Sequence, residues 1–364
     1  MTNKHGQPDD ASTTARPNEV QPAFEPRTNN GQVVRIMRSR VTAAMFVALA
    51  LAASGCSSSS TSSTAGTSGS AAAKTYKVTL IKGVNGDPFY ATMACGVQAE
   101  AAKLGATVTV VGGDKWGADV QTPVVNSVTA QHPDAVLVAP NDSKAMFSPL
   151  KQLTDAGIKL VIVDTGLDDE SIALSVISSD NAGGGKLAAD ELGKEIGGKG
   201  SVFVMNVQAG ISTTDARAKG FTDEMAAAFP NVKVLETQYN NDDPAKAASI
   251  TTSELSAHPD LAGVFATNVQ GAEGTATGLK QANKQGAVKV ISYDAGPQQV
   301  KDLNDGTVQG LIAQDPYTEG VDALDQAIAA LSGKPVDKAV HTSLAALTKD
   351  NLSANARFVY KDSC

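Results

Sequence analysis

The sequence predicts an α/β protein made of two similar lobes, each built on a parallel β-sheet. Short apolar runs alternate with amphipathic stretches of helical length, which is typical of parallel sheets covered by helices. Two stretches also read alike, AQHPDAVLVAPND (130–142) and SAHPDLAGVFATNV (256–269), and each turns at His-Pro-Asp before an apolar strand. A chain of 364 residues is long enough to form two such lobes.

The first 56 residues precede this α/β body and have the pattern of an export signal. Residues 1–36 are polar and lack periodicity, whereas residues 37–56, MRSRVTAAMFVALALAASGC, combine a basic start, a short apolar run and small residues before Cys56. This resembles a bacterial lipoprotein signal, in which the cysteine is lipidated and becomes the mature N-terminus. The alternative is an ordinary hydrophobic segment with a chance cysteine. The signal fits best if Met37 is the true start.

The composition of the segment after Cys56 indicates where the protein is located. Residues 57–75 are rich in Ser, Thr, Gly and Ala, which predicts a flexible tether. A lipid, a tether and a folded body together predict an extracytoplasmic protein, lipid-anchored to the cell membrane.

Acidic residues outnumber basic ones by 38 to 30, so we expect no nucleic-acid partner. The four histidines lack zinc-ligand spacing and no CxxC motif occurs, so no metal site and no cofactor is expected.

In the first lobe, the apolar run KVTLIKG (77–83) predicts a strand that leads into a helix beginning near Phe89. The segment between them, GDPFY (86–90), places an acid and two aromatic rings where the strand gives way to the helix. A later strand, IKLVIVDTG (158–166), ends at Asp164. Ligands in open α/β sheets bind beyond the carboxyl ends of the strands, so both acids are expected at the ligand-binding edge.

The second lobe repeats this order of elements. SVFVMNV (201–207) predicts its opening strand, and GKLAADELGKEIG (185–197) and ARAKGFTDEMAAAF (216–229) predict helices. Two later strands end at Asn268 and at Asp294, the latter in VKVISYDAG. These positions correspond to strand ends in the first lobe, so polar side chains from both lobes are expected to face the ligand.

Nine stretches match one family in the same order along the chain: DPFY, LGATVTVVGGD, AVLVAPND, GIKLVIVDT, SSDNAGGGKLAADEL, TTDARAKGF, HPDLAGVFATN, ISYDAG and GLIAQDP. From about Lys77 onward the chain resembles the sugar-binding proteins of bacterial ABC importers, of the ribose- and galactose-binding type. The resemblance implies two Rossmann-like lobes joined by three crossover segments, with a sugar in the cleft. It implies that the first lobe comprises residues 76–179 and 315–343 and the second 180–314 and 344–364.

The resemblance also implies a set of ligand-binding residues. Carboxylates accept hydrogen bonds from sugar hydroxyls, Arg and Asn donate to hydroxyl oxygens, and aromatic rings cover the apolar C–H face of a sugar. Five positions depart from the ribose-binding pattern. Asp87 replaces Asn, Thr165 replaces Arg and Ala139 replaces Asn. A phenylalanine ligand of the pattern falls near Asp242, in the polar stretch NNDDPA, and Val269 stands where an acid is usual. We therefore expect a small neutral sugar or polyol other than ribose. The implied ligand-binding residues are Asp87, Phe89, Tyr90, Asp164, Thr165, Arg217, Asn268, Asp294 and Gln314.

Each of these residues also has a purely structural interpretation. Asp87 could do no more than cap the following helix, the aromatic rings could lie in the core, and the other aspartates could form turns. Arg217 could make a surface salt bridge, while Asn268 and Gln314 could satisfy turn and hinge backbone groups. For Trp116, in DKWGAD, we expect a ring that covers the sheet edge rather than one that reaches the cleft.

The predicted function is a substrate-binding lipoprotein that delivers its ligand to the permease subunits of an ABC importer. A receptor of the same fold that signals to a membrane partner is the alternative. A transcriptional repressor would need an N-terminal helix-turn-helix, and the sequence of residues 1–55 predicts none. An enzyme is not expected, because the sequence contains no GxSxG motif and no paired catalytic carboxylates.

Cys95 and Cys364 remain once Cys56 is assigned to the lipid. Export favours oxidation, and two remaining cysteines in a secreted body tend to bond. The apolar stripe of the predicted first helix includes Met93 and Leu104, and Cys95 lies about 200° away from Met93 around the helix. We therefore predict a disulfide between Cys95 and Cys364.

Overall fold

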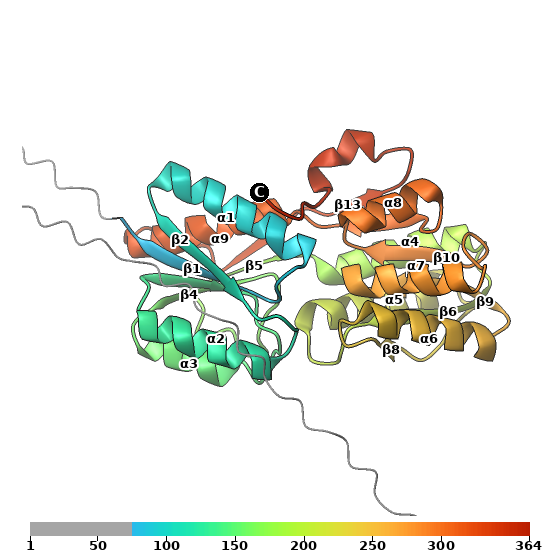
Figure 1. The fold of residues 1–364 in the computed structure, drawn as a ribbon, viewed down its shortest axis with the longest axis horizontal. Coiled ribbons are helices and arrows are strands. Elements are labelled where there is room, and N and C mark those ends of the chain that lie inside the picture. The colour runs from blue at the N-terminus through green and yellow to red at the C-terminus, as the bar shows by residue number, and fades with distance from the viewer. Residues whose placement is uncertain (1–74) are drawn as a thin grey trace, which may run out of the picture. The chain divides into compact units, whose positions relative to one another are not determined.

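The computed structural model describes residues 75–364, drawn in colour in Figure 1. The predicted export signal, the lipidation site Cys56 and the tether up to residue 74 lie outside the described residues. The described part of the chain forms two α/β lobes, and parallel strands dominate both sheets. This is the predicted fold class.

The first lobe is a six-stranded parallel sheet with helices on both faces. Its strands run in the order β12-β5-β4-β3-β1-β2, and every neighbouring pair is parallel. Figure 1 shows α1 and α9 on one face and α2 and α3 on the other. The elements are β1 (Lys77–Lys82), α1 (Pro88–Leu104), β2 (Thr107–Gly112), α2 (Ala118–Gln131), β3 (Ala135–Val138), α3 (Phe147–Asp155), β4 (Lys159–Val163), β5 (Ser175–Ser179), α9 (Pro316–Leu331) and β12 (Ala339–Thr342).

The second lobe repeats this plan with seven strands. Their order is β13-β11-β10-β9-β6-β7, with β8 also paired to β6, and β13 runs antiparallel to β11. The elements are α4 (Asn181–Glu195), β6 (Gly200–Asn206), α5 (Ser212–Ala228), β7 (Val232–Val234), β8 (Gln238–Tyr239), α6 (Pro244–Ala257), β9 (Leu261–Ala266), α7 (Val269–Gln281), β10 (Lys289–Tyr293), α8 (Pro297–Asp305), β11 (Gly310–Ala313), β13 (Ala345–Leu347) and the 3₁₀ helix η1 (Ser353–Phe358).

Local sequence explains where α1 begins and ends. Asp87 caps its start, because its Oδ1 accepts a 2.8 Å hydrogen bond from the Phe89 N–H, and Pro88 suits the first helical turn. Gly105 ends the helix with a φ of 67°, which glycine adopts without strain. Leu104 was expected in the apolar stripe, but it is the last residue of the helix and is 43% exposed.

Glycines allow one helix pair in each lobe to pack closely. A Cβ added at Gly96 of α1 would lie 2.1 Å from the carbonyl oxygen of Tyr317 in α9. A Cβ added at Gly185 of α4 would likewise lie 2.1 Å from the carbonyl oxygen of Arg217 in α5. Since no side chain fits at either position, the two helices of each pair meet backbone to backbone at these contacts. The second contact holds the turn of α5 that carries Arg217 against α4.

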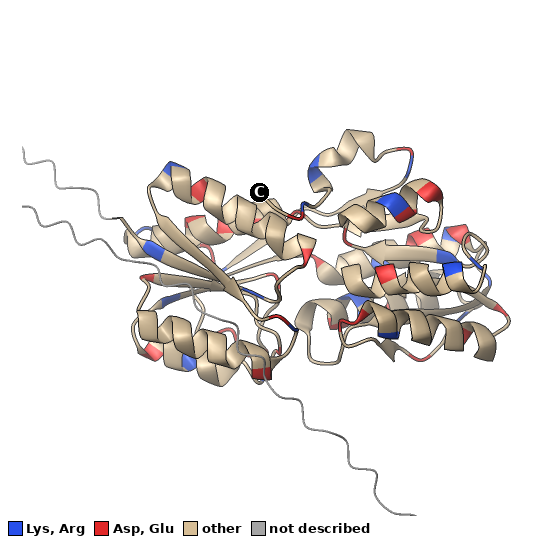
Figure 2. Ribbon diagram, viewed as in Figure 1, with Lys and Arg blue, Asp and Glu red and all other residues tan. Residues whose placement is uncertain are grey.

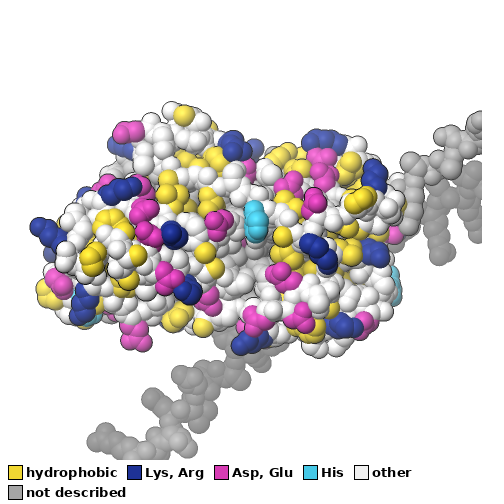
Figure 3. Space-filling model, turned by 180° about the vertical axis from the view of Figure 1, so that it is seen from behind, with side chains coloured by type: hydrophobic (Ala, Val, Ile, Leu, Met, Phe, Trp, Pro, Cys, Tyr) yellow, Lys and Arg dark blue, Asp and Glu magenta, His cyan; other side chains and the backbone are white. Residues whose placement is uncertain are grey.

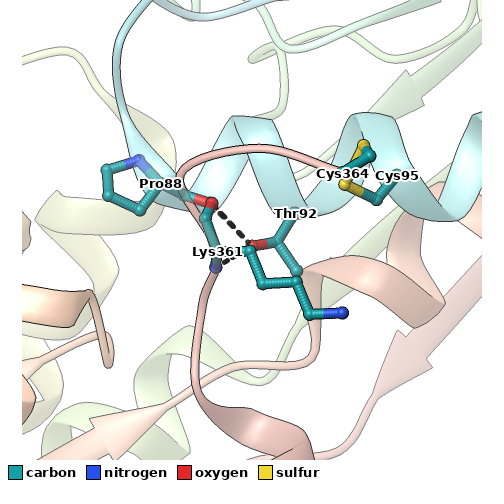
Figure 4. Close-up of a disulfide and its surroundings, with 5 residues drawn as sticks. All are labelled: Pro88, Thr92, Cys95, Lys361 and Cys364. Atoms are coloured by element: carbon teal, nitrogen blue, oxygen red, sulfur yellow. Dashed lines mark hydrogen bonds between the residues drawn. A yellow bond between two sulfur atoms is a disulfide. The ribbon is translucent and has the colours of Figure 1, made fainter.

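Three segments cross between the lobes, from β5 to α4, from β11 to α9 and from β12 to β13. The C-terminal tail requires a correction, because residues 361–364 were expected with the second lobe. They lie against α1 of the first lobe, where the Lys361 N–H donates to Thr92 Oγ1 at 2.7 Å. A disulfide joins Cys364 to Cys95, as Figure 4 shows, so the tail is fixed to α1 both covalently and by hydrogen bonding.

The surface carries charges of both signs. Figure 2 shows Lys and Arg interspersed with Asp and Glu over both lobes. On the opposite side of the molecule, Figure 3 shows hydrophobic side chains in small groups among charged ones. Within residues 75–364, no helix combines the length and the apolar character that a membrane crossing requires.

Candidate functional site

A cavity of about 420 Å³, including its mouth, lies between the two lobes. Strand ends and helix starts of both lobes form its walls, as expected for an open α/β sheet. The cavity is lined by Asp87, Phe89, Tyr90, Trp116, Asp164, Val207, Ile211, Thr213, Thr214, Arg217, Asp242, Asn268, Asp294 and Gln314.

The start of α1 supplies an acid and two rings to the cavity. Asp87 caps the helix and also lines the cavity, so its structural and its binding interpretation hold together. The rings of Phe89 and Tyr90 meet edge to face with their centroids 5.1 Å apart. The Tyr90 hydroxyl donates a 2.6 Å hydrogen bond to Oδ2 of Asp164, which fixes both side chains.

Asp164 and Asp294 occupy corresponding positions in the two lobes. Each follows a central strand, β4 or β10, and each has a left-handed backbone, with φ of 65° and 76°. Each backbone N–H also donates to the neighbouring strand, to the carbonyl of Ile177 or of Ile312, at 2.8 Å in both cases. A left-handed non-glycine residue at a strand end is uncommon, and here it occurs at both strand ends that turn a carboxylate into the cavity.

Arg217 of α5 is held rigidly although it is only 3% exposed. Its Nε donates to Asn181 Oδ1 and its Nη1 donates to the Thr267 carbonyl, both at 2.8 Å. The guanidinium lies 3.8 Å above the centre of the Tyr293 ring. Burial therefore excludes the alternative role of Arg217 in a surface salt bridge. The guanidinium is instead positioned as a hydrogen-bond donor at the cavity wall.

Asn268 and Asp242 form a second polar pair. Asn268 Oδ1 accepts from the Gly271 N–H at the start of α7, and its Nδ2 donates to Asp242 Oδ1 at 2.8 Å. The sequence did not identify Asp242 as a site residue. The run NNDDPA held the available signal, because the resemblance implied a phenylalanine ligand near this position and an acid stands there instead.

Gln314 and Tyr360 converge on Asp294. Gln314 Nε2 donates to Asp294 Oδ1 at 2.7 Å, and the Tyr360 hydroxyl donates to the same oxygen at 2.9 Å. Tyr360 was not among the predicted site residues, because it lies 66 residues from Asp294 in a tail without a motif.

Two expectations about cavity residues are wrong. Thr165 does not line the cavity: it is 1% exposed, and its Oγ1 has no hydrogen-bond partner within residues 75–364. Only one of two consecutive residues faces the cavity at this strand end, and that residue is Asp164. Trp116 does line it, because its Nε1 donates to the Asn141 carbonyl at 3.0 Å and its ring stacks on Tyr90 at 6.3 Å.

The electrostatics of the cavity are dominated by four carboxyl groups and one guanidinium. Burial raises the pKa of Asp164 to about 6, although Arg217 opposes the shift, and burial raises the pKa of Asp242 to about 6. Burial, followed by the charges of Asp294 and Asp242, raises the pKa of Asp87 well above its usual range. A ligand that donates hydrogen bonds to these groups would compensate for their lost hydration.

This arrangement can bind a compact molecule with several hydroxyl groups. The carboxylates accept, Arg217 and Asn268 donate, and the aromatic rings offer apolar faces. In the part of the chain that the structure describes, no group of three or more His, Cys, Asp or Glu side chains is placed to hold a metal ion.

A family model described as a periplasmic binding protein domain matches residues 78–335. The ribose import binding protein of Escherichia coli (strain K12) is 31% identical over 259 residues, which cover 71% of this chain and 86% of that protein. The D-allose-binding periplasmic protein of the same organism is 28% identical over 282 residues, covering 74% and 89%. These relatives are binding proteins of transport systems and not enzymes.

Solved structures of solute-binding proteins are also similar to this chain. An ABC transporter solute-binding protein from Agrobacterium vitis, bound to α-D-tagatopyranose, is 40% identical and matches with a TM-score of 0.77 over 79% of this chain and 99% of that one. A second solute-binding protein from Agrobacterium vitis, with bound D-fucose, is 28% identical and has a TM-score of 0.75 over 78% and 100%.

Proposed function

Because this chain belongs to the periplasmic binding protein family, we propose that it captures a neutral monosaccharide or sugar alcohol between its lobes and delivers it to an ABC importer. The observation that carries the proposal is the cavity between the lobes, where Asp87 and Asp164 of the first lobe meet Arg217 and Asp294 of the second. Hydroxyl groups of a sugar match this set of acceptors and donors.

Charge favours a neutral ligand. One arginine faces four carboxyl groups in the cavity, so a uronic acid or a sugar phosphate would meet more repulsion than attraction. The bound or named ligands of the relatives, ribose, allose, tagatose and fucose, support a small sugar as the ligand class.

Ligand capture would use the movement of the lobes about their three crossovers. A sugar that contacts both lobes favours the closed form over the open one. The permease subunits would then recognise the closed form. A family of periplasmic binding proteins functions outside the cytoplasm, and we propose that Cys56 anchors this one to the membrane through a lipid, because residues 37–56 have the pattern of a lipoprotein signal.

A thermal-shift screen of residues 57–364 tests the proposal. The panel contains D-ribose, D-allose, D-tagatose, D-fucose and xylitol, with D-glucuronic acid and ribose 5-phosphate as charged controls. A ligand at 100 times its dissociation constant stabilises the fold by about 2.7 kcal/mol, which raises the melting temperature measurably. Stabilisation by a neutral compound supports the proposal. A larger shift with the two acids, or no shift with any sugar or polyol, contradicts it.

A further inference from the structure

We propose that the C-terminal segment Tyr360–Cys364 is part of the binding machinery. Tyr360 positions Asp294 for the ligand, and the disulfide between Cys95 and Cys364 holds the segment across the boundary between the lobes. The inference rests on the proposed function, since it takes Asp294 as a ligand-binding residue.

The hydroxyl of Tyr360 is shared by two cavity residues. It donates to Asp294 Oδ1 at 2.9 Å and accepts from the Gln314 N–H at 3.0 Å. Gln314 Nε2 donates to the same Asp294 oxygen, so two donors converge on one carboxylate oxygen and fix its orientation. Because Tyr360 is only 3% exposed, water does not compete for these bonds, and burial keeps the hydroxyl in its donating form by raising the pKa of Tyr360.

The ring of Tyr360 also reaches the first lobe. It packs edge-on against Phe89, with the ring centroids 5.7 Å apart. Phe89 lines the cavity from the start of α1. Tyr360 therefore supports one cavity residue from each lobe.

The chain changes lobes between two consecutive residues. The Tyr360 N–H donates to the Ala295 carbonyl of the second lobe at 2.9 Å. The next residue, Lys361, donates its N–H to Thr92 Oγ1 of the first lobe, and Figure 4 shows that the same hydroxyl bonds the Pro88 carbonyl. The tail thus forms a fourth connection between the lobes, without a linker.

The disulfide limits how far the two lobes can separate at this connection. If opening of the cleft breaks the Lys361 bonds, four residues still lead from Tyr360 to Cys364, and four extended residues reach about 14 Å at most. The disulfide adds the 5.4 Å between the Cα atoms of Cys364 and Cys95 on α1. Without the disulfide the tail has no such limit. The oxidised tail should therefore disfavour wide opening and keep Tyr360 beside Asp294, and both effects favour ligand binding.

The Tyr360→Phe variant tests the positioning role, because it keeps the ring and removes the hydroxyl. With D-tagatose and D-allose as probes, we expect affinity to fall about tenfold, the effect of one hydrogen bond to a charged group. Loss of this donor raises the pKa of Asp294, so the loss of affinity on acidification should begin at a higher pH than in the native protein. The matched control is Tyr239→Phe, at a tyrosine that is 40% exposed. Native affinity and an unchanged pH profile in Tyr360→Phe would overturn the positioning role.

The double variant Cys95→Ser/Cys364→Ser tests the connection. Small-angle scattering of the ligand-free protein should give a larger radius of gyration than for the oxidised native protein, and reduction of the native protein should reproduce the increase. Sugar affinity should fall along with it. Equal dimensions and equal affinity would overturn the connection. If the native protein binds no sugar, the proposed function and the role of Tyr360 fail together, while scattering still decides on the connection.

Discussion

Ser179 Oγ donates a 2.8 Å hydrogen bond to Oε1 of Glu319, and the two residues lie beside different crossings between the lobes. Thr342 Oγ1, at the end of β12, lies 3.1 Å from the same oxygen. Glu319 in the first turn of α9 thus joins all three crossovers at a site that is fully buried. Burial, followed by the charge of Asp164, raises its pKa well above the usual value.

This arrangement predicts a pH-dependent stability. The folded-state pKa of Glu319 lies above the unfolded one, so the folded protein binds more protons, and stability falls as pH rises from the unfolded value towards the folded one. The Glu319→Gln variant should lose part of this fall at pH values above the ordinary glutamate pKa of 4.5, measured as melting temperature. Exposed Glu236 provides the control Glu236→Gln, which should follow the native curve. A native curve in Glu319→Gln would contradict the assignment.

Asp294→Asn should weaken sugar binding without unfolding the protein. The amide keeps an oxygen for Gln314 and Tyr360 but loses the negative charge, and a hydrogen bond to a charged group is worth about 1.5–3 kcal/mol. We expect affinity to fall roughly 10- to 100-fold in calorimetric titrations. Asp350→Asn, at an exposed position, should bind normally. Unchanged affinity in Asp294→Asn would place the ligand elsewhere.

Sugar affinity should decrease as the pH falls through 6. Burial raises the pKa of both Asp164 and Asp242 to about 6, and protonation removes the negative charge and replaces part of the acceptor capacity for hydroxyl groups with an O–H donor. The ligand-free protein should respond in the opposite sense, because raised folded-state pKa values make it more stable as the pH falls from 7 to 5. Titrations at pH 5 and 8 measure the first effect, and Asp164→Asn should flatten it. Equal affinity at both values would be inconsistent with ionised acceptors.

Trp116 should report ligand binding through its fluorescence. It is the one tryptophan in the sequence, it lines the cavity and its ring stacks on Tyr90. A bound sugar changes the polarity around the indole, so the emission should shift in a saturable way with the affinity found by calorimetry. Trp116→Phe should bind sugar with a modest loss of affinity and lose the signal. Sugar binding that leaves the emission of the native protein unchanged would show that Trp116 stands apart from the ligand.

Gly96→Ala should destabilise the first lobe. Its Cβ would lie 2.1 Å from the carbonyl oxygen of Tyr317, and overpacking of this kind costs about 1–3 kcal/mol of unfolding free energy. Urea titration measures the loss, and sugar affinity of the folded fraction should change little. Gln98→Ala, at an exposed position on the same helix, should be neutral. Full stability in Gly96→Ala would mean that α1 and α9 can separate without cost.

Local and repeated patterns predicted the fold and the frame of the site. The His-Pro-Asp repeat identified two equivalent lobes, and the acids at strand ends identified Asp164 and Asp294. Both aspartates line the cavity, because parallel sheets bring the carboxyl ends of their strands to one edge. The resemblance located Arg217 and Gln314, which no local pattern would have distinguished from a surface arginine and a hinge glutamine.

The remaining site residues depend on tertiary contacts that local sequence does not encode. Trp116 lines the cavity because its indole N–H donates to the Asn141 carbonyl. Tyr360 does not line the cavity but contacts the lining residues Asp294 and Phe89 from behind, because the tail returns over α1. Asp242 lies in an irregular loop with a φ of 59°, where neither strand nor helix periodicity applies. The prediction for Thr165 was wrong because only its neighbour Asp164 faces the cavity at this strand end, although the stretch that contains both residues matches the family.

The interleaved order of the two lobes constrains how the protein is made. The sheet of the first lobe is completed by β12 beside β5, the face of α1 is covered by α9, and the second sheet ends with β13. When the ribosome has synthesised the chain as far as β11, neither lobe has its full set of elements. Neither lobe can therefore complete its hydrophobic core until about the last fifty residues have been synthesised. The unfinished chain stays accessible to chaperones and targeting factors for most of its synthesis.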